Sequence, residues 1–258
     1  NGGLHAVFGL PINNTVTFSI IGIVTVLYLI SSMTGLDRGI QILSKTNVMI
    51  AILLLLFVLA AGPTSYILNI LTTTMGEFVS QFVTLSLSTN PFEGYEWTKS
   101  WTLFYWAWWI SWSPFVGLFV AGISRGRTIR EFISGALLVP TLLTFIWFAV
   151  FGGTGLDLQL HKGVDLASEA LSDVSTVLFT MFSYLPLGNL LSILAIVLLS
   201  VFFVTSADSA TFVLGMMTSN GDLNPPASKK LTWGILQSFA AVILLTFGGL
   251  EALQRMAI

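Results

Sequence analysis

Apolar residues fill six stretches of the chain, while polar and charged residues gather in the connections between them. Each stretch approaches the roughly 20 residues that a helix needs to cross the hydrocarbon core of a bilayer. Runs of this length are typical of membrane-spanning helices. The sequence therefore predicts an all-α, polytopic integral membrane protein, with one transmembrane domain over residues 1–258 and spans at about 14–35, 47–63, 101–123, 132–152, 187–216 and 231–249.

Two further segments, at about 64–90 and 169–185, mix apolar and polar positions at helical spacing. This spacing is typical of a helix that lies along a membrane surface. The sequence favours a surface-packed connector in both places. The alternative is a gating role, with 169–185 as a cap over an outer vestibule.

Lysine and arginine are distributed unevenly between the two sets of connections. One set holds Lys99, Lys162 and Arg255. The other set holds seven basic residues: Arg38, Lys45, Arg125, Arg127, Arg130, Lys229 and Lys230. Because cytoplasmic loops of membrane proteins carry an excess of Lys and Arg, the second set is predicted to be cytoplasmic.

The composition agrees with a lipid environment. Hydrophobic residues make up 55% of the 258 residues, and charged residues only 9%. Globular proteins carry about 25% charged residues, so lipid is the expected solvent for much of the surface. A bilayer is accordingly the first expected partner.

Several classes of function are excluded. Cysteine is absent, which removes disulfides and thiolate chemistry. A net charge of −2 without a basic run indicates no nucleic-acid partner. The histidines are His5 and His161, and no metal-ligand cluster or nucleophile–base pair is evident, so we expect neither an enzyme nor an organic cofactor. Since Asn1 replaces an initiator Met, we expect the sequence to begin inside a longer polypeptide.

The span at 101–123 carries an unusual set of aromatic residues. They recur at steps of three and four, so they share one broad helix face: Tyr105, Trp108, Trp109, Trp112, Phe115 and Phe119. Ring faces attract a desolvated cation by about 0.5–2 kcal/mol each, without any carboxylate. Trp108, Trp109 and Trp112 are therefore predicted to contact a cationic substrate. The alternative is an aromatic helix–helix seam with an interfacial belt, which is our interpretation of Trp101 and Trp106.

A proline interrupts the same span. Pro114 has no backbone N–H, so the carbonyl of Ile110 loses its helical donor. Broken helices near the midplane are one way in which transporters expose backbone to ligands and ions. A kink that serves only packing is the other interpretation.

Hydroxyl groups cluster in the span at 187–216, from Thr205 to Thr211. Sodium prefers hard oxygen donors, so Thr205 and Ser206 are candidate ligands. Hydrogen bonding back to their own helix is the alternative. Asp208 is the one acid that the sequence places within a span. We expect it to pair with an arginine near the cytoplasmic end, and direct ion binding is the other possibility.

Three arginines follow the aromatic span directly: Arg125, Arg127 and Arg130. They are candidates for ion pairs that lock a cytoplasmic gate, or for contacts with anionic headgroups. Positive-inside placement alone also explains them.

The sequence resembles the betaine/choline/carnitine transporter family. The resemblance is strongest in Trp-Thr-x-x-Tyr-Trp-x-Trp-Trp, from Trp101 to Trp109, and in the following ISWSPFVGLFVAGISRGRTIREF. It extends over essentially the whole chain through FGLPINN, SSMTGLDRGI, VPTLLTFIWFAVFG, VTSADSATFVLGMM and GGLEALQ.

The resemblance implies a leucine-transporter-like fold with two inverted five-helix repeats, of which this chain would supply the sixth to eleventh spans. It implies that Trp108, Trp109 and Trp112, with Tyr105 beside them, belong to an aromatic substrate site. It also implies sodium as coupling ion, bound by Phe202, Thr205 and Ser206, with Phe115 at a second sodium position.

The expected function is sodium-coupled uptake of a quaternary-ammonium solute, such as glycine betaine or choline, by a multi-pass protein of the bacterial inner membrane. The alternatives are a sodium-independent carnitine- or betaine-type exchanger and a truncated membrane fragment that does not transport. The resemblance further implies a possible homotrimer, or self-association that completes the fold.

Overall fold

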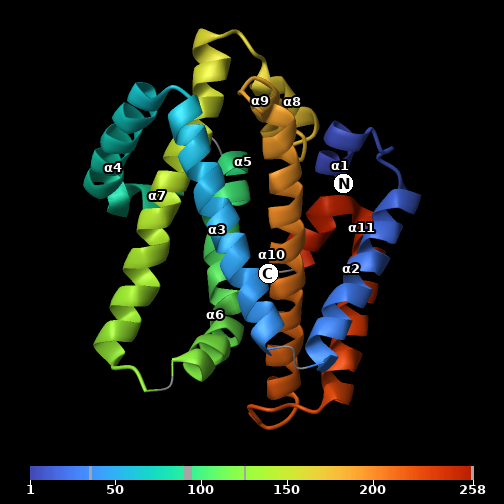
Figure 1. Ribbon diagram of the computed structural model, residues 1–258. Helices are drawn as coiled ribbons and strands as arrows, with labels where there is room; N and C mark the ends of the chain where they lie inside the picture. Colours follow the sequence, from blue (N-terminus) through green and yellow to red (C-terminus); the bar gives the residue numbers. More distant parts are fainter. Residues whose placement is uncertain (35–36, 90–94, 125, 257–258) are drawn as a thin grey trace. The chain divides into compact units, whose positions relative to one another are not determined.

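The computed structural model describes residues 1–34, 37–89, 95–124 and 126–256, and every regular element in these ranges is a helix (Figure 1). In chain order the helices are α1 (Gly2–Phe8), α2 (Asn14–Thr34), α3 (Asp37–Ala61), α4 (Thr64–Leu87), α5 (Tyr95–Thr98), the π-helical η1 (Lys99–Leu103), α6 (Phe104–Ile123), α7 (Ile129–His161), α8 (Leu166–Ser172), α9 (Val177–Ser183), α10 (Gly188–Met217) and α11 (Ala227–Met256).

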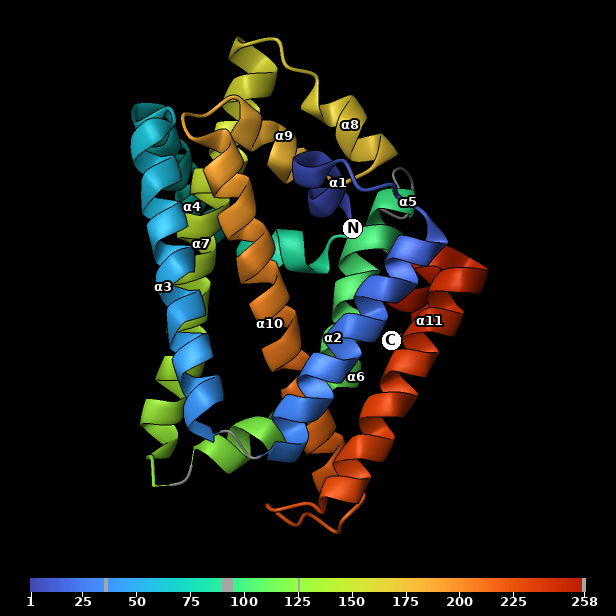
Figure 2. The same ribbon diagram turned by 45° about the vertical axis from the view of Figure 1, so that its right-hand side comes forward.

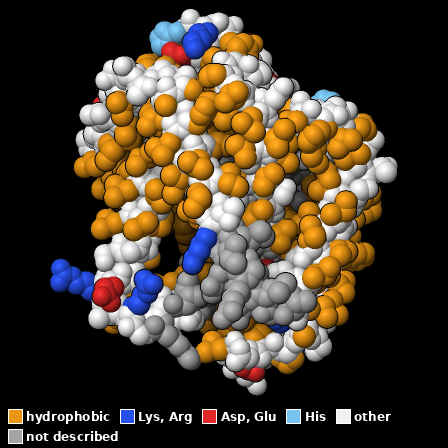
Figure 3. Space-filling view, in the orientation of Figure 1, with side chains coloured by type: hydrophobic (Ala, Val, Ile, Leu, Met, Phe, Trp, Pro, Cys, Tyr) orange, Lys and Arg blue, Asp and Glu red, His pale blue; other side chains and the backbone are white. Residues whose placement is uncertain are grey.

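Six of the described helices are long and apolar enough to cross a membrane. The candidate segments are Asn14–Met33, Ser44–Ala61, Glu96–Gly122, Ile129–His161, Gly188–Met217 and Ala227–Gly249. Each overlaps one of the six stretches that the sequence predicts, so the prediction of an all-α protein with six spans is confirmed. Hydrophobic side chains dominate the face in Figure 3.

Helix α7 is longer than the predicted span 132–152 at both ends. At its start, the Thr128 N–H and hydroxyl both donate to Glu131 Oε2 at 3.0 Å, and the Glu131 N–H donates to Thr128 Oγ1 at 3.3 Å. This reciprocal capping box begins the helix three residues early. At its end, Thr154 and Asp157 are buried, because the helix continues as a packed element after its apolar run stops.

The predicted surface helix 169–185 is wrong as a single element, because α8 and α9 divide it. Asp173 has an extended backbone (φ −153°, ψ 96°), and its carboxylate accepts from the Ser175 N–H at 2.9 Å and hydroxyl at 2.7 Å. Such local bonding by Asp competes with the helical ladder and ends it. The Ser175 side-chain and backbone hydrogen bonds also lower the pKa of Asp173. Helix α4 is continuous, and its position along a membrane surface stays a prediction.

The chain forms two compact units, and their boundaries fall within α4, α7 and α11. Unit 1 comprises Asn1–Leu71 and Thr141–Ser238, and unit 2 comprises Thr72–Pro140 and Phe239–Ile258. The prediction of a single transmembrane domain over residues 1–258 stays a prediction.

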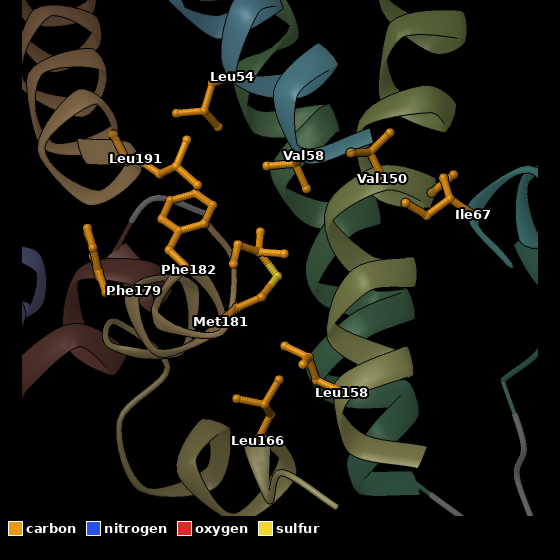
Figure 4. Close-up of a cluster of buried hydrophobic side chains, with 13 residues drawn as sticks. Leu54, Val58, Ile67, Val150, Leu158, Leu166, Phe179, Met181, Phe182 and Leu191 are labelled. Atoms are coloured by element: carbon orange, nitrogen blue, oxygen red, sulfur yellow. The ribbon is translucent and has the colours of Figure 1, made fainter. Parts of the chain in front are cut away.

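Unit 1 contains the main hydrophobic core (Figure 4). Side chains from α3, the start of α4, α7, α8, α9 and α10 meet there, among them Val58, Ile67, Val150, Leu158 and Phe182. Helix α10 also contacts α2 and α3 along its length, and in both ribbon views α10 lies beside them (Figures 1 and 2).

Short helices cover the end of α10 at which it begins. Helix α1 contacts α9 and α10, and α8 contacts α9. Glu169 of α8 accepts hydrogen bonds from Thr176 at 2.7 Å and Thr180 at 2.6 Å, which ties α8 to the chain entering α9. Asp165 caps α8 by accepting from the Ser168 N–H at 3.1 Å, and hydrogen bonding by the Ser168 side chain and backbone lowers its pKa.

Unit 2 contains α6, which follows η1 directly. Trp106 Nε1 donates to the Ser86 carbonyl of α4 at 3.1 Å, so these two helices share a hydrogen bond. Within α11, Gly249 has φ 62° and ψ −158°, a left-handed backbone that a β-carbon would strain. This break lies at the residue where the predicted span 231–249 ends.

We expect Phe182→Ala to destabilise the protein by about 3–5 kcal/mol, because it leaves a cavity in a closed core. Phe182 is 0% exposed, and its ring lies 6.3 Å from that of Phe151. The measurement is unfolding of the detergent-solubilised full-length protein. The control is Leu171→Ala in α8, where the side chain is 90% exposed and the expected change is within about 0.5 kcal/mol. Equal destabilisation by both variants would contradict the assigned core.

Candidate functional site

Five aromatic residues of η1 and α6 form a continuous row within unit 2. We call this row the aromatic ladder, and it consists of Trp101, Tyr105, Trp108, Trp112 and Phe115. Successive ring centroids lie 6.1, 5.8, 5.9 and 5.7 Å apart. The spacing of three and four residues predicts this face, and the structure brings these side chains together.

Trp108 and Trp112 form the middle of the ladder, and Trp109 lies beside Trp108. Trp108 is half-buried and contacts Trp109 at a centroid distance of 6.1 Å. Trp109 is 65% exposed and Trp112 is 39% exposed. Trp112 packs edge-to-face on Trp108, whereas the ring of Trp109 is tilted by 46° against it.

The outer aromatic residues differ in role. Trp106 donates its indole N–H to Ser86, which confirms its interpretation as a helix–helix contact. Trp101 stacks on Tyr105 with an interplanar angle of 19° and thereby extends the ladder. It lies in the π-helical turn η1, a conformation that is frequent at functional sites.

Helix α6 continues through Pro114 without losing its helical assignment. Ser113, the residue before Pro114, donates its hydroxyl to the Trp109 carbonyl one turn earlier at 2.6 Å. The carbonyl of Ile110 still lacks the donor that Pro114 cannot supply. The use of this carbonyl by a ligand stays a prediction.

The hydroxyl cluster of α10 lies in unit 1, and its donors are used inside the helix. Thr205 Oγ1 donates to the carbonyls of Val201 and Phe202, both at 3.0 Å, and Ser209 donates to the Thr205 carbonyl at 2.9 Å. Bonding back to the same helix is thus present. A hydroxyl that donates keeps lone pairs that can coordinate a cation.

The remaining candidate sodium residues are spread over both units. Ser206 is exposed, and Phe202 is exposed on the same helix. Phe115 is half-buried on α6, in unit 2. The sodium assignments of Phe202, Thr205, Ser206 and Phe115 stay predictions.

The charged candidates are only partly described. Arg125 lies outside the described residues, whereas Arg127 and Arg130 are exposed at the start of α7. Asp208 is half-buried on α10 and has an interaction partner. Its pairing with an arginine, and a gate formed by Arg127 and Arg130, stay predictions.

Sequence reasoning missed a set of polar residues on α2. Thr25, Tyr28 and Ser32 form hydrogen bonds with α10 and α11 inside unit 1. Their spacing of three and four residues places them on one face of an otherwise apolar span. That spacing was a detectable signal, although the partners were not readable from it.

Six long apolar helices in the described part of the chain define a polytopic helical membrane protein. The sequence model of the BCCT family, described as betaine/carnitine/choline family transporter, matches residues 1–258. The chain belongs to this family. The family consists of transporters, which confirms the prediction that this protein is not an enzyme.

Three relatives illustrate the similarity. The chain is 52% identical over 260 residues to "Glycine betaine transporter OpuD" of Bacillus subtilis (strain 168), covering 100% of this chain and 50% of that protein. It is 47% identical over 254 residues to "Ectoine/hydroxyectoine transporter" of Virgibacillus pantothenticus, covering 98% and 51%. It is 43% identical over 256 residues to "Glycine betaine transporter 1" of Vibrio parahaemolyticus, covering 98% and 48%. The chain therefore spans about half the length of these relatives.

We expect Trp109→Ala in the full-length protein to weaken binding of a trimethylammonium ligand by about 1–2 kcal/mol, the size of a desolvated cation–π contact. Calorimetric titration with glycine betaine measures the change. The matched control is Trp106→Ala, which removes an equally large indole that is engaged with Ser86. If the two variants lose the same affinity, or if neither loses any, Trp109 is not part of a cation site.

Proposed function

We propose that this chain forms part of a sodium-coupled symporter for a quaternary-ammonium compatible solute, with glycine betaine first and choline second. The observation that carries the proposal is the aromatic ladder of η1 and α6, together with the exposed side chain of Trp109 beside it. Family membership supports it, as do the betaine transporter names of relatives at 52% and 43% identity.

The chemistry of the solute fits this kind of wall. A trimethylammonium group has no N–H to donate, so hydrogen-bond acceptors hold it poorly. Aromatic faces attract it electrostatically and also cover its methyl groups. Trp108, Trp109, Trp112 and Tyr105 are the proposed contacts. A wall without a carboxylate also avoids the desolvation cost of a second buried charge.

Sodium coupling is assigned to α10. Thr205 and Ser206 would offer hydroxyl oxygens to the cation, and Phe202 would supply its carbonyl from one turn earlier. Phe115 is the proposed contact at a second sodium position. Pro114 would contribute by freeing the Ile110 carbonyl for a ligand.

A sodium-independent exchanger of carnitine or betaine type is the second candidate. One observation favours it, namely that the Thr205 hydroxyl donates to two carbonyls of its own helix. If these bonds within the helix satisfy the Thr205 hydroxyl, α10 needs no sodium ion to complete its hydrogen bonding. A fragment without transport is the third candidate, because the chain spans only half the length of its relatives.

We place the protein in the bacterial inner membrane as a multi-pass component. All three relatives named above come from bacteria, and six described helices are long enough to span. The seven basic residues of the predicted cytoplasmic connections would then face the cell interior.

Uptake of radiolabelled betaine, choline and carnitine by cells that express the full-length protein tests the proposal. We expect betaine uptake to rise with external sodium and to fall when potassium replaces it. Uptake that is independent of sodium but accelerated by internal carnitine or betaine would establish the exchanger instead. A full-length protein without uptake of any of the three solutes would contradict transport.

We expect Thr205→Ala and Ser206→Ala each to raise the sodium concentration for half-maximal uptake by about tenfold or more, since contacts with charged groups contribute about 1.5–3 kcal/mol. Ser200→Ala is the matched control on the same helix, where the hydroxyl donates to the Ile196 carbonyl at 2.8 Å. Sodium dependence that is identical in all four proteins would remove α10 from the coupling site.

A further inference from the structure

A chain of hydrogen bonds joins α2, α10 and α11 within unit 1. It involves five polar side chains that the proposed transport chemistry does not use. We call this set the polar seam, and it consists of Thr25, Tyr28, Ser32, Thr211 and Ser238, together with the ammonium group of Lys230.

The first part of the seam joins α2 to α11. Tyr28 donates its hydroxyl to the Gly234 carbonyl at 2.6 Å and lies 2.6 Å from the Ser238 hydroxyl. Ser238 also lies 2.6 Å from the Thr25 hydroxyl. A β-carbon at Gly234 would lie 2.5 Å from Leu29 and 3.1 Å from Tyr28, so glycine permits this close approach.

The second part of the seam reaches α10. Lys230 Nζ donates to the Ser32 carbonyl near the end of α2. The Ser32 and Thr211 hydroxyls lie 3.2 Å apart, and Thr211 donates to the Asp208 carbonyl at 2.7 Å. Either hydroxyl can be the donor in the contact between Ser32 and Thr211. Whichever of the two donates, this contact joins α2 to α10.

Two of these hydroxyls are buried inside the protein. Thr211 is 0% exposed and Ser32 is 4% exposed. A buried hydroxyl that loses its partner is costly to leave unpaired. Gly215 adds to the fit, because a β-carbon there would meet Pro225 at 3.0 Å and the Lys230 stem at 3.4 Å.

The Lys230 ammonium group of the polar seam belongs to a residue in an unfavourable position for a cation. Lys230 lies in the first turn of α11, where the helix dipole disfavours positive charge. Its ammonium group instead reaches the carboxyl-terminal end of α2, where the dipole favours positive charge. Lys229 does the same for α10, since it donates to the Thr218 carbonyl just after that helix ends. The two lysines thus hold α2 and α10 against α11.

The end point of the seam lies close to the candidate sodium ligands. Six residues separate Thr205 from Thr211, which is about 9 Å along a helix. The Asp208 carbonyl that Thr211 engages lies between them. A rotation of α10 about its own axis turns all of its side chains by the same angle. A rotation that moves Thr211 away from Ser32 would therefore also redirect the hydroxyls of Thr205 and Ser206.

We propose that Ser32, Thr211 and Lys230 are positioning residues that hold α10 in the rotation needed for cation binding at Thr205 and Ser206. This inference rests on the proposed sodium coupling. It adds the α2–α10–α11 contact as the determinant of cation affinity, although none of these three side chains touches the cation.

The test is the sodium dependence of betaine uptake by full-length Thr211→Val, a substitution that keeps the shape of the side chain and removes the hydroxyl. We expect the half-saturating sodium concentration to rise by about three- to tenfold, because the variant loses the contacts of the Thr211 hydroxyl with Ser32 and with the Asp208 carbonyl. The betaine KM at saturating sodium should stay at the wild-type value. Thr211→Ser restores a hydroxyl and should restore the sodium dependence.

Two further variants keep the test informative if Thr211→Val reduces the amount of folded protein. Ser32→Ala and Lys230→Met should produce the same shift per correctly inserted molecule. Ser32→Ala combined with Thr211→Val should produce no larger shift than Thr211→Val alone, because Thr211→Val already removes the bond between the two hydroxyls. Thr232→Val is the matched control, since its hydroxyl donates to Ser228 within α11 at 2.9 Å.

The outcomes separate the two proposals. Wild-type uptake that does not depend on sodium defeats both the sodium coupling and the positioning role. Sodium-dependent wild-type uptake with an unchanged half-saturating concentration in Thr211→Val, Ser32→Ala and Lys230→Met defeats the positioning role alone. A lowered maximal rate without any shift in sodium dependence also defeats it, since that is the result of a purely structural bond.

Discussion

The bilayer core offers no water, so every polar group in a spanning helix must find its partner inside the protein. Most hydroxyls in the described spans meet this constraint locally. Thr25, Ser113, Thr205 and Thr246 each donate to a carbonyl four residues earlier. Such bonds place a polar residue in the membrane without committing its helix to a neighbour. The hydroxyls that also reach another helix are therefore the informative ones, and in unit 1 they converge on the polar seam.

The same constraint explains why the candidate solute site is aromatic. An indole presents a face that attracts cations and one N–H that needs a single acceptor. Trp106 resolves this need with the Ser86 carbonyl, and its ring is thereby committed to packing against α4. From Tyr105 to Phe115, the rings of the aromatic ladder instead pack edge-to-face along α6, as Trp108 and Trp112 do. Their faces can recognise a methylated ammonium ion without introducing a buried counter-charge.

The sequence predicted what depends on local spacing and length. Six spans were predicted from the apolar runs. Steps of three and four residues predicted that the aromatic side chains of α6 share one face. The residues at which helices begin and end could not be predicted from the apolar runs, because hydrogen-bonding side chains determine them. Thr128 and Glu131 start α7 early, and Asp173 separates α8 from α9. The polar seam was beyond prediction for another reason. The face formed by Thr25, Tyr28 and Ser32 was visible, but its partners on α10 and α11 depend on the packing of three helices.

The ladder and the seam belong to different helices, and thermodynamic linkage predicts how their perturbations differ. If sodium on α10 and solute on α6 are coupled, each changes the affinity for the other by the same factor. Loss of a ladder ring removes contacts with the solute itself, so it weakens solute binding at every sodium concentration. On the proposed positioning role, loss of a seam bond weakens only the binding of the ion, so its effect on solute affinity disappears once sodium saturates. A helix can therefore control coupling through the bonds that fix its rotation, while the residues that touch the solute remain unchanged.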